Sequence, residues 1–167
     1  MFAPPTIDFR EPAEGYRELE KQLCALLHGE RDALANLANT AALLFHTLPD
    51  LNWAGFYRLT GCELVLGPFQ GRPACVRIPL GKGVCGAAAA RRATVVVSNV
   101  REFPGHIACD AASNSEIVVP LLKDGVLLGV LDLDSPKLGR FGTADQTGLE
   151  RLMAALVAAS DGVKINR

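Results

Sequence analysis

The amino-acid sequence predicts a single α+β domain, with helices packed mainly on one face of an antiparallel, six-stranded sheet. Apolar residues recur every three or four positions up to Pro49 and in alternate positions over much of the following stretch. The dipeptide Asp124-Gly125 then separates two apolar runs, as in a β-hairpin, and helical spacing returns from Thr143. No internal repeat or linker divides the chain, so one domain accounts for its length.

Composition narrows the class of protein. Of the 167 residues, 49% are hydrophobic and 21% are charged, which is typical of a globular domain. The formal net charge of −1 argues against a nucleic-acid or membrane-surface partner. No apolar run reaches the roughly 18 residues of a membrane span, and residues 1–12 lack a secretory pattern. We therefore expect a cytoplasmic protein whose five cysteines serve metal binding or redox chemistry rather than static disulfides.

Two helices are predicted before Pro49. Residues 1–15 contain three prolines and little periodicity, so we assign them to an N-terminal arm and the domain to 16–167. The first helix is marked by leucines at 19, 23, 26 and 27, and the second by an apolar stripe over 34–48 after a break at 28–30. Neither helix is apolar all round, so each is expected to lay one face on the sheet.

The remaining elements follow from alternation and turn residues. Strands are predicted at 53–59, 62–69, 76–80, 94–100, 116–123 and 126–134, with a short alanine-rich helix at 83–93 and a loop at 101–115. The tight turn Thr60-Gly61 joins the first two strands. A closing helix at 143–160 has Thr143 as its N-cap residue.

Three cysteines gather in one part of the chain. Cys75, Cys85 and Cys109 fall within 35 residues, in loops or at element edges, whereas Cys24 and Cys62 are interpreted as small structural residues. The gaps between the three are too wide for the close pairs of a structural zinc site. A thiol cycle is the better interpretation, because a sulfenic acid condenses with a nearby thiol to form a disulfide.

Local physical chemistry leaves the nucleophile open between two cysteines. Cys85 lies in the first turn of a predicted helix, where the helix dipole favours a thiolate. Cys109 lies in a small-residue loop three residues after His106, whose cationic form would favour a thiolate in the same way. His106 and Cys109 also form a candidate ligand pair, but a complete four-ligand set is missing, so no metal site is predicted.

Three carboxyl groups are candidates for one site. Asp132 and Asp134 are two residues apart on a strand and share a face. A two-residue hairpin loop would pair Glu116 with residue 133 and turn it away from both aspartates, whereas a three-residue loop with a G1 bulge would pair Glu116 with Asp132 and place all three on one face. Such a cluster favours a cationic ligand or a proton shared between the acids.

The strand at 53–59 carries two further candidates. Trp53 and Tyr57 are four residues apart and face the same side of the sheet. Core packing is the simpler interpretation, and it holds for Phe56. Trp53 and Tyr57 would also suit the wall of a pocket for a small cation or a thioether.

These residues lie in three long motifs that resemble one family. GPFQGRPACVRIPLGKGVCGAAA (67–89), FPGHIACDAASNSEIVVP (103–120) and GVLDLDSP (129–136) are similar to the free methionine-(R)-sulfoxide reductases, which are stand-alone proteins with a GAF fold. The resemblance covers residues 18–160 and keeps the motifs in order. It therefore implies a GAF domain and an oxidoreductase acting on free methionine sulfoxide.

The resemblance also implies roles for individual residues. Cys109 corresponds to the nucleophile, Cys75 to the main resolving cysteine and Cys85 to an auxiliary one. Thioredoxin would supply the reducing equivalents, with no other cofactor, and a homodimer would fit the habits of GAF domains. The acidic set Glu116, Asp132 and Asp134 would hold the substrate ammonium and assist protonation, and Trp53 and Tyr57 would line the pocket.

Two rival functions belong to other classes. A non-enzymatic GAF sensor would bind a cyclic nucleotide or another small ligand, but it would not need Cys75, Cys85 and Cys109 together. A thiol redox switch or a zinc protein would act through a partner and would lose its function or its metal when Cys109 is replaced. Both account for fewer of the motifs than the reductase does.

Overall fold

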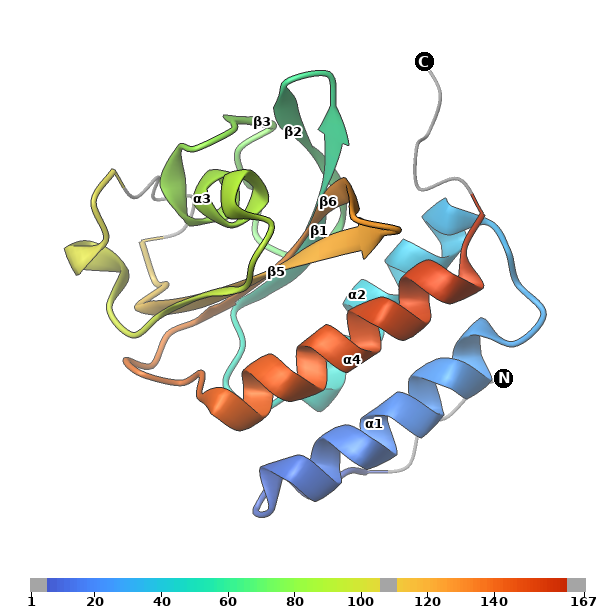
Figure 1. The fold of residues 1–167 in the computed structure, drawn as a ribbon. Coiled ribbons are helices and arrows are strands. Elements are labelled where there is room, and N and C mark those ends of the chain that lie inside the picture. Colours follow the sequence, from blue (N-terminus) through green and yellow to red (C-terminus); the bar gives the residue numbers. More distant parts are fainter. Residues whose placement is uncertain (1–5, 106–110, 162–167) are drawn as a thin grey trace.

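A computed structural model describes residues 6–105 and 111–161, and these residues have the predicted α+β class (Figure 1). The helices are α1 (Pro12–Leu27), α2 (Ala33–Thr47), α3 (Gly83–Arg91) and α4 (Thr143–Ala159). The strands are β1 (Trp53–Thr60), β2 (Glu63–Gly71), β3 (Arg77–Pro79), β4 (Val95–Val97), β5 (Ser115–Lys123) and β6 (Val126–Ser135). They form one antiparallel sheet in the order β3-β2-β1-β6-β5-β4. No helix in the described ranges is long and apolar enough to cross a lipid bilayer.

Helices cover the two faces of the sheet unequally. α2 and α4 lie against one face, α1 packs on the outer side of α4, and α3 lies on the opposite face (Figure 1). We expected α1 to lie on the sheet itself, but its main partner is α4. The two helices approach closely because Gly148 faces Tyr16: a Cβ atom at residue 148 would lie 2.2 Å from the Tyr16 ring.

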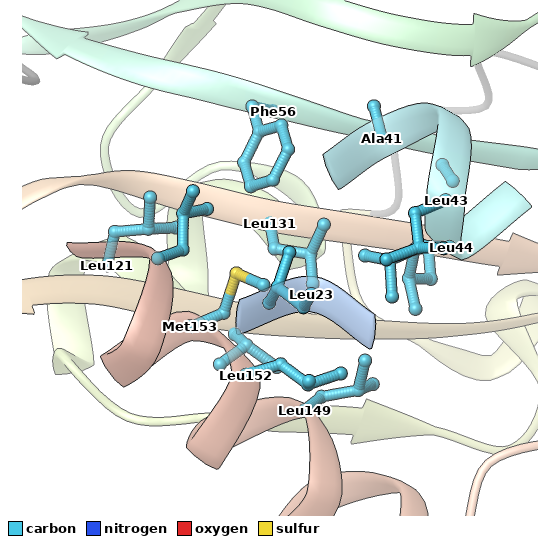
Figure 2. Close-up of a cluster of buried hydrophobic side chains, with 14 of the residues drawn as sticks. Leu23, Ala41, Leu43, Leu44, Phe56, Leu121, Leu131, Leu149, Leu152 and Met153 are labelled. Carbon is cyan, nitrogen blue, oxygen red and sulfur yellow. The ribbon is translucent and has the colours of Figure 1, made fainter. Parts of the chain in front are cut away.

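The larger core fills the space between the sheet and α1, α2 and α4. Figure 2 shows Phe56 and Leu131 from the sheet meeting Leu23 of α1 and Leu152 of α4. All four side chains are fully or almost fully buried. Burying each one stabilises the fold by about 1.5–3 kcal/mol relative to leaving it exposed.

The largest differences from the predicted element boundaries are in α1 and β4. α1 begins at Pro12 rather than Tyr16, since proline is well tolerated in the first turn of a helix, where its missing N–H costs no hydrogen bond. Phe9 from the predicted arm packs edge-on against Tyr16, with 5.6 Å between ring centroids. The predicted strand at 94–100 shortens to β4, because the Asn99 side chain accepts a hydrogen bond from the Arg101 backbone N–H and starts a 3₁₀ turn.

The β5–β6 hairpin has a register that neither predicted alternative contains. Its loop is the two-residue Asp124-Gly125 turn, in which both residues have positive φ and Lys123 pairs with Val126. A bulge then follows, because Leu121 pairs with Gly129 while Leu122 pairs with Leu127. The extra residue shifts the remaining ladder by one position. Glu116 therefore pairs with Asp134, not with residue 133 or Asp132.

Candidate active site

The sheet face under α3 gathers the predicted acids and aromatics. Trp53 pairs with Asp134 across β1 and β6, and Gly55 pairs with Asp132. Because paired residues project to the same face and Glu116 pairs with Asp134, all three carboxyl groups share this face with Trp53 and Tyr57. The shared face agrees with the three-residue-loop alternative, although the register that produces it is different.

The carboxyl groups are largely removed from water. Glu116 is 6% exposed and Asp132 is 7% exposed, while Asp134 is half-buried. Cys85, from the first turn of α3, closes over them: its Sγ and one carboxylate oxygen each from Glu116 and Asp132 all lie within 4.8 Å of one another. Because Glu116 and Asp132 are both buried and lie close together, the ionisation of one opposes the ionisation of the other.

Burial dominates the acid–base chemistry of the pair. It raises the pKa of Glu116 well above its ordinary value, and the charges of Asp132 and Asp134 act in the same direction. Burial also raises the pKa of Asp132 to about 6, against the opposing effect of hydrogen bonds from Cys85 and Glu116. Of the two acids, Glu116 is therefore the one whose protonated form is favoured, with Asp132 as its hydrogen-bond acceptor.

The thiol of Cys85 behaves differently from the sequence-based expectation. We expected the N-terminus of α3 to favour a thiolate. Instead burial, followed by the charges of Asp132 and Glu116, raises the pKa of Cys85 well above its ordinary value. A hydrogen bond from the thiol to Asp132 has the same effect. The helix dipole is a smaller influence than desolvation beside carboxylates.

Three aromatic rings wall the site. Trp53 stacks on Tyr57 with ring centroids 5.9 Å apart, and on Phe69 of β2 with centroids 5.4 Å apart. Gly55 makes room for this stack, because a Cβ atom there would lie 2.4 Å from Phe69 Cβ and 2.5 Å from the Trp53 ring. Trp53 and Tyr57 thus line a pocket and also belong to the core on this face.

The polar ends of the two predicted aromatics fix the segment that carries Cys75. Tyr57 Oη donates to the backbone oxygen of Cys75 at 3.0 Å, and Trp53 Nε1 donates to that of Arg72 at 3.0 Å. Cys75 itself is half-buried in the connection between β2 and β3. A small hollow lies beside this segment, lined by Trp53, Tyr57, Arg72, Pro73, Ala74, Asp132 and Asp134.

The cluster of Cys85, Glu116 and Asp132 also bears on whether this site could bind zinc. Cys85, Glu116 and Asp132 are of a kind and spacing that could surround an ion, whereas the zinc interpretation of the sequence needed several cysteines and His106. Among the described residues, which do not include His106 and Cys109, these three side chains are one short of the four in a closed structural zinc site. Cys85 and Glu116 both hydrogen-bond to Asp132, so the three described side chains fit an acid network.

Comparison with known proteins decides the family. The GAF domain model matches residues 23–160. The chain is 56% identical to free methionine-R-sulfoxide reductase of Escherichia coli over 143 residues, covering 86% of this chain and 87% of that protein. The chain belongs to the free methionine-R-sulfoxide reductase family.

Two further relatives support the same family assignment. The yeast protein of the same name, from Saccharomyces cerevisiae, is 45% identical and matches 76% of this chain and 75% of its own length. The X-ray structure of free methionine-R-sulfoxide reductase from Neisseria meningitidis in complex with its substrate superposes with a TM-score of 0.91. It is 46% identical and covers 95% of each chain. The recognition made from the three motifs is confirmed.

The structure brings most, but not all, of the predicted reductase residues together. Trp53, Tyr57, Glu116, Asp132 and Asp134 surround one region, with Cys85 above the acids and Cys75 on the adjoining segment. Cys109, together with His106, lies outside the described residues, so its place beside the acids stays a prediction.

Sequence reasoning missed Phe69 and Gly55. Simple alternation from the Thr60-Gly61 turn places Phe69 on the opposite face of the sheet from Trp53, so it predicts no role for Phe69 in the site. A bulge around Gly67-Pro68 shifts that register between the Gly55–Phe69 and Tyr57–Leu66 pairs. The proline within a strand was the signal, since it commonly marks a bulge.

Proposed function

We propose that this chain reduces free L-methionine-(R)-sulfoxide to L-methionine. The observation that carries the proposal is the set of three carboxyl groups on one aromatic-walled face, in a chain of the reductase family. The substrate-bound neisserial relative supports the same substrate for this fold. The roles of the individual residues are part of the proposal.

Recognition depends on the ammonium group of a free amino acid. Asp132 lines the hollow, and its Oδ1 is buried without a hydrogen-bond partner. A buried, unpaired carboxylate oxygen costs about 1–3 kcal/mol or more, which a cationic donor from the substrate would offset. A methionine sulfoxide residue within a peptide lacks this ammonium and would leave the oxygen unpaired, so the site should select the free amino acid.

The chemistry needs a soft nucleophile and a proton. The thiolate of Cys109 attacks the sulfoxide sulfur, and Glu116, whose raised pKa favours its protonated form, protonates the sulfoxide oxygen. Oxygen passes to the cysteine: the substrate sulfur is reduced by two electrons and leaves as the thioether methionine, and Cys109 becomes a sulfenic acid. Trp53 and Tyr57 would hold the S-methyl end of the substrate.

Recycling uses a second thiol. Cys75 attacks the sulfenic sulfur of Cys109, forming a disulfide and releasing water, and thioredoxin then reduces the disulfide by dithiol exchange. Cys75 suits this step because it is half-buried rather than sealed, on a segment that Tyr57 holds beside the site. A dithiol reductant implies a reducing compartment, in agreement with the cytoplasmic location that we expect. By analogy with other GAF domains, we also expect a homodimer.

An assay with the separated R and S epimers of free methionine sulfoxide tests the function. With dithiothreitol or thioredoxin, the R epimer should yield methionine and the S epimer should not. Cys109→Ser should abolish turnover, and Cys75→Ser should lose chiefly the thioredoxin-dependent rate. Cys24→Ser, at an exposed position on α1, serves as the matched control and should retain the full rate. Full activity in Cys109→Ser, or an enzyme indifferent to the epimer, would refute the proposal.

A further inference from the structure

Cys85 occupies a position unlike that of any other described cysteine. It is 4% exposed, whereas Cys75 is half-buried and Cys24 and Cys62 are exposed. α3 is pressed onto the neighbouring segment, since a Cβ atom at Gly86 would lie 2.5 Å from the Pro79 backbone oxygen. The thiol therefore sits in a tightly packed layer, with its sulfur turned to the acids on the sheet.

This position is poor for thiol exchange. Attack on a sulfenic acid or a disulfide requires a thiolate that can reach its partner. Burial and the charges of the neighbouring carboxylates oppose the thiolate form of Cys85, and packing under α3 denies access to a protein reductant. A recycling role for Cys85 would require α3 to lift from the sheet.

The contacts of Asp132 point to another role. Asp132 accepts hydrogen bonds from the Cys85 thiol and from Glu116, while its Oδ1 has no partner. Two donors, one on α3 and one on β5, hold the carboxylate in one orientation. The unpartnered oxygen is then the one left for a cation in the hollow that Asp132 lines.

We propose that Cys85 is a positioning residue whose thiol donates a hydrogen bond that orients Asp132 and leaves Asp132 Oδ1 for the substrate ammonium. The inference rests on the proposed function, because it concerns the same substrate. The inference gives the two candidate resolving cysteines different roles. Cys75 exchanges disulfides, and Cys85 orients a side chain of the binding site.

Three replacements of Cys85 separate hydrogen bonding from packing. Cys85→Ser keeps a donor, Cys85→Val keeps the volume without a donor, and Cys85→Ala loses both. The readout is the fluorescence of Trp53, the single tryptophan of the chain, titrated with L-methionine as the probe. Trp53 lines the hollow and stacks on Tyr57, so occupancy of the site should change its emission.

We expect the valine and alanine variants to bind L-methionine about tenfold more weakly, as for the loss of one hydrogen bond to a charged group. The serine variant should stay within about twofold of the parent chain. In turnover, valine and alanine should raise KM for the R-sulfoxide by a similar factor, with little change in kcat. Cys24→Ser should alter neither quantity.

Several outcomes would overturn the inference. Unchanged L-methionine binding in both Cys85→Val and Cys85→Ala would remove the thiol from recognition. A serine variant as weak as alanine would mean that a donor does not matter. An equal loss of kcat in all three variants, with binding intact, would restore Cys85 to the recycling steps. If the parent chain neither binds L-methionine nor turns over the sulfoxide, the proposed function fails first, and the inference falls with it.

Discussion

The two faces of the sheet bury different kinds of side chain. Under α2 and α4, the face carries an apolar core in which Phe56 and Leu131 meet leucines of the helices (Figure 2). Under α3, the other face combines aliphatic and aromatic side chains with Glu116, Asp132 and the thiol of Cys85. The same strands build both faces, because alternate residues of β1, β5 and β6 project to opposite sides.

The face under α2 and α4 serves stability, and the face under α3 serves function. Apolar burial on the helical face stabilises the fold without any chemical constraint. On the other face, carboxyl groups held close together in a dry environment cost stability, because their ionised forms are disfavoured. Replacements on the helical face should therefore change unfolding, and replacements of the acids should change catalysis.

The largest expected effect comes from Glu116→Gln. Glutamine resembles the protonated form of Glu116 and can still donate to Asp132, but it cannot deliver a proton to the sulfoxide oxygen. We expect kcat to fall by about 100-fold or more, the usual contribution of general acid catalysis, with the melting temperature at pH 7 unchanged or raised. Steady-state kinetics and thermal unfolding check both values. A variant that keeps its rate would remove Glu116 from proton transfer.

Leu152→Ala should lower the stability of the fold and leave catalysis unchanged. Leu152 is fully buried in the helical-face core, and its truncation leaves a cavity, so the free energy of unfolding should drop by about 2–5 kcal/mol. The folded fraction should retain the KM and kcat of the parent chain, as measured by urea unfolding and kinetics on the same sample. A marked change of KM at full folding would show that the two faces are coupled.

The acids should also make stability depend on pH. The pKa of Asp132 is raised to about 6 in the folded chain, above its value in an unfolded chain. Its contribution is therefore complete below about pH 4 and is lost as the pH rises through the folded value. Between pH 5 and 8 the free energy of unfolding should decrease by about 1–3 kcal/mol more in the parent chain than in Asp132→Asn. Parallel curves for the two proteins, from urea unfolding at several pH values, would contradict the buried-acid interpretation.

Tyr16→Phe gives the smallest effect and concerns the helical face alone. Tyr16 Oη donates a buried hydrogen bond of 2.9 Å to Asp145, which Arg140 also contacts at 2.8 Å. Its loss should lower the free energy of unfolding by about 1–2 kcal/mol without changing kcat. Arg17→Ala, which removes an exposed ion pair with Glu14, is the matched control and should cost less than about 0.5 kcal/mol. Equal effects of the two replacements in urea unfolding would argue against a structural role for Tyr16 Oη.

Much of this organisation is predictable from the sequence. Period and turn dipeptides locate the elements, although Gly142 rather than the predicted Thr143 is the N-cap residue of α4, and alternation alone places Asp132 and Asp134 on one face. The hairpin register was missed, because the bulge follows an ordinary two-residue turn, and Pro120 and Gly129 beside it do not by themselves fix which strand carries the extra residue. The state of Cys85 also escapes sequence reasoning, since it is set by residues more than 30 positions away that the fold brings to the N-terminus of α3.

The central claim is that a buried acidic set selects a free amino acid by its ammonium group. The most direct test compares kcat/KM for free L-methionine-(R)-sulfoxide with that for its N-acetyl derivative, which has the same sulfoxide and no cationic nitrogen. The account predicts a value at least about 100-fold lower for the acetylated compound, as for a buried charge left without its partner. Comparable values for the two compounds would contradict it.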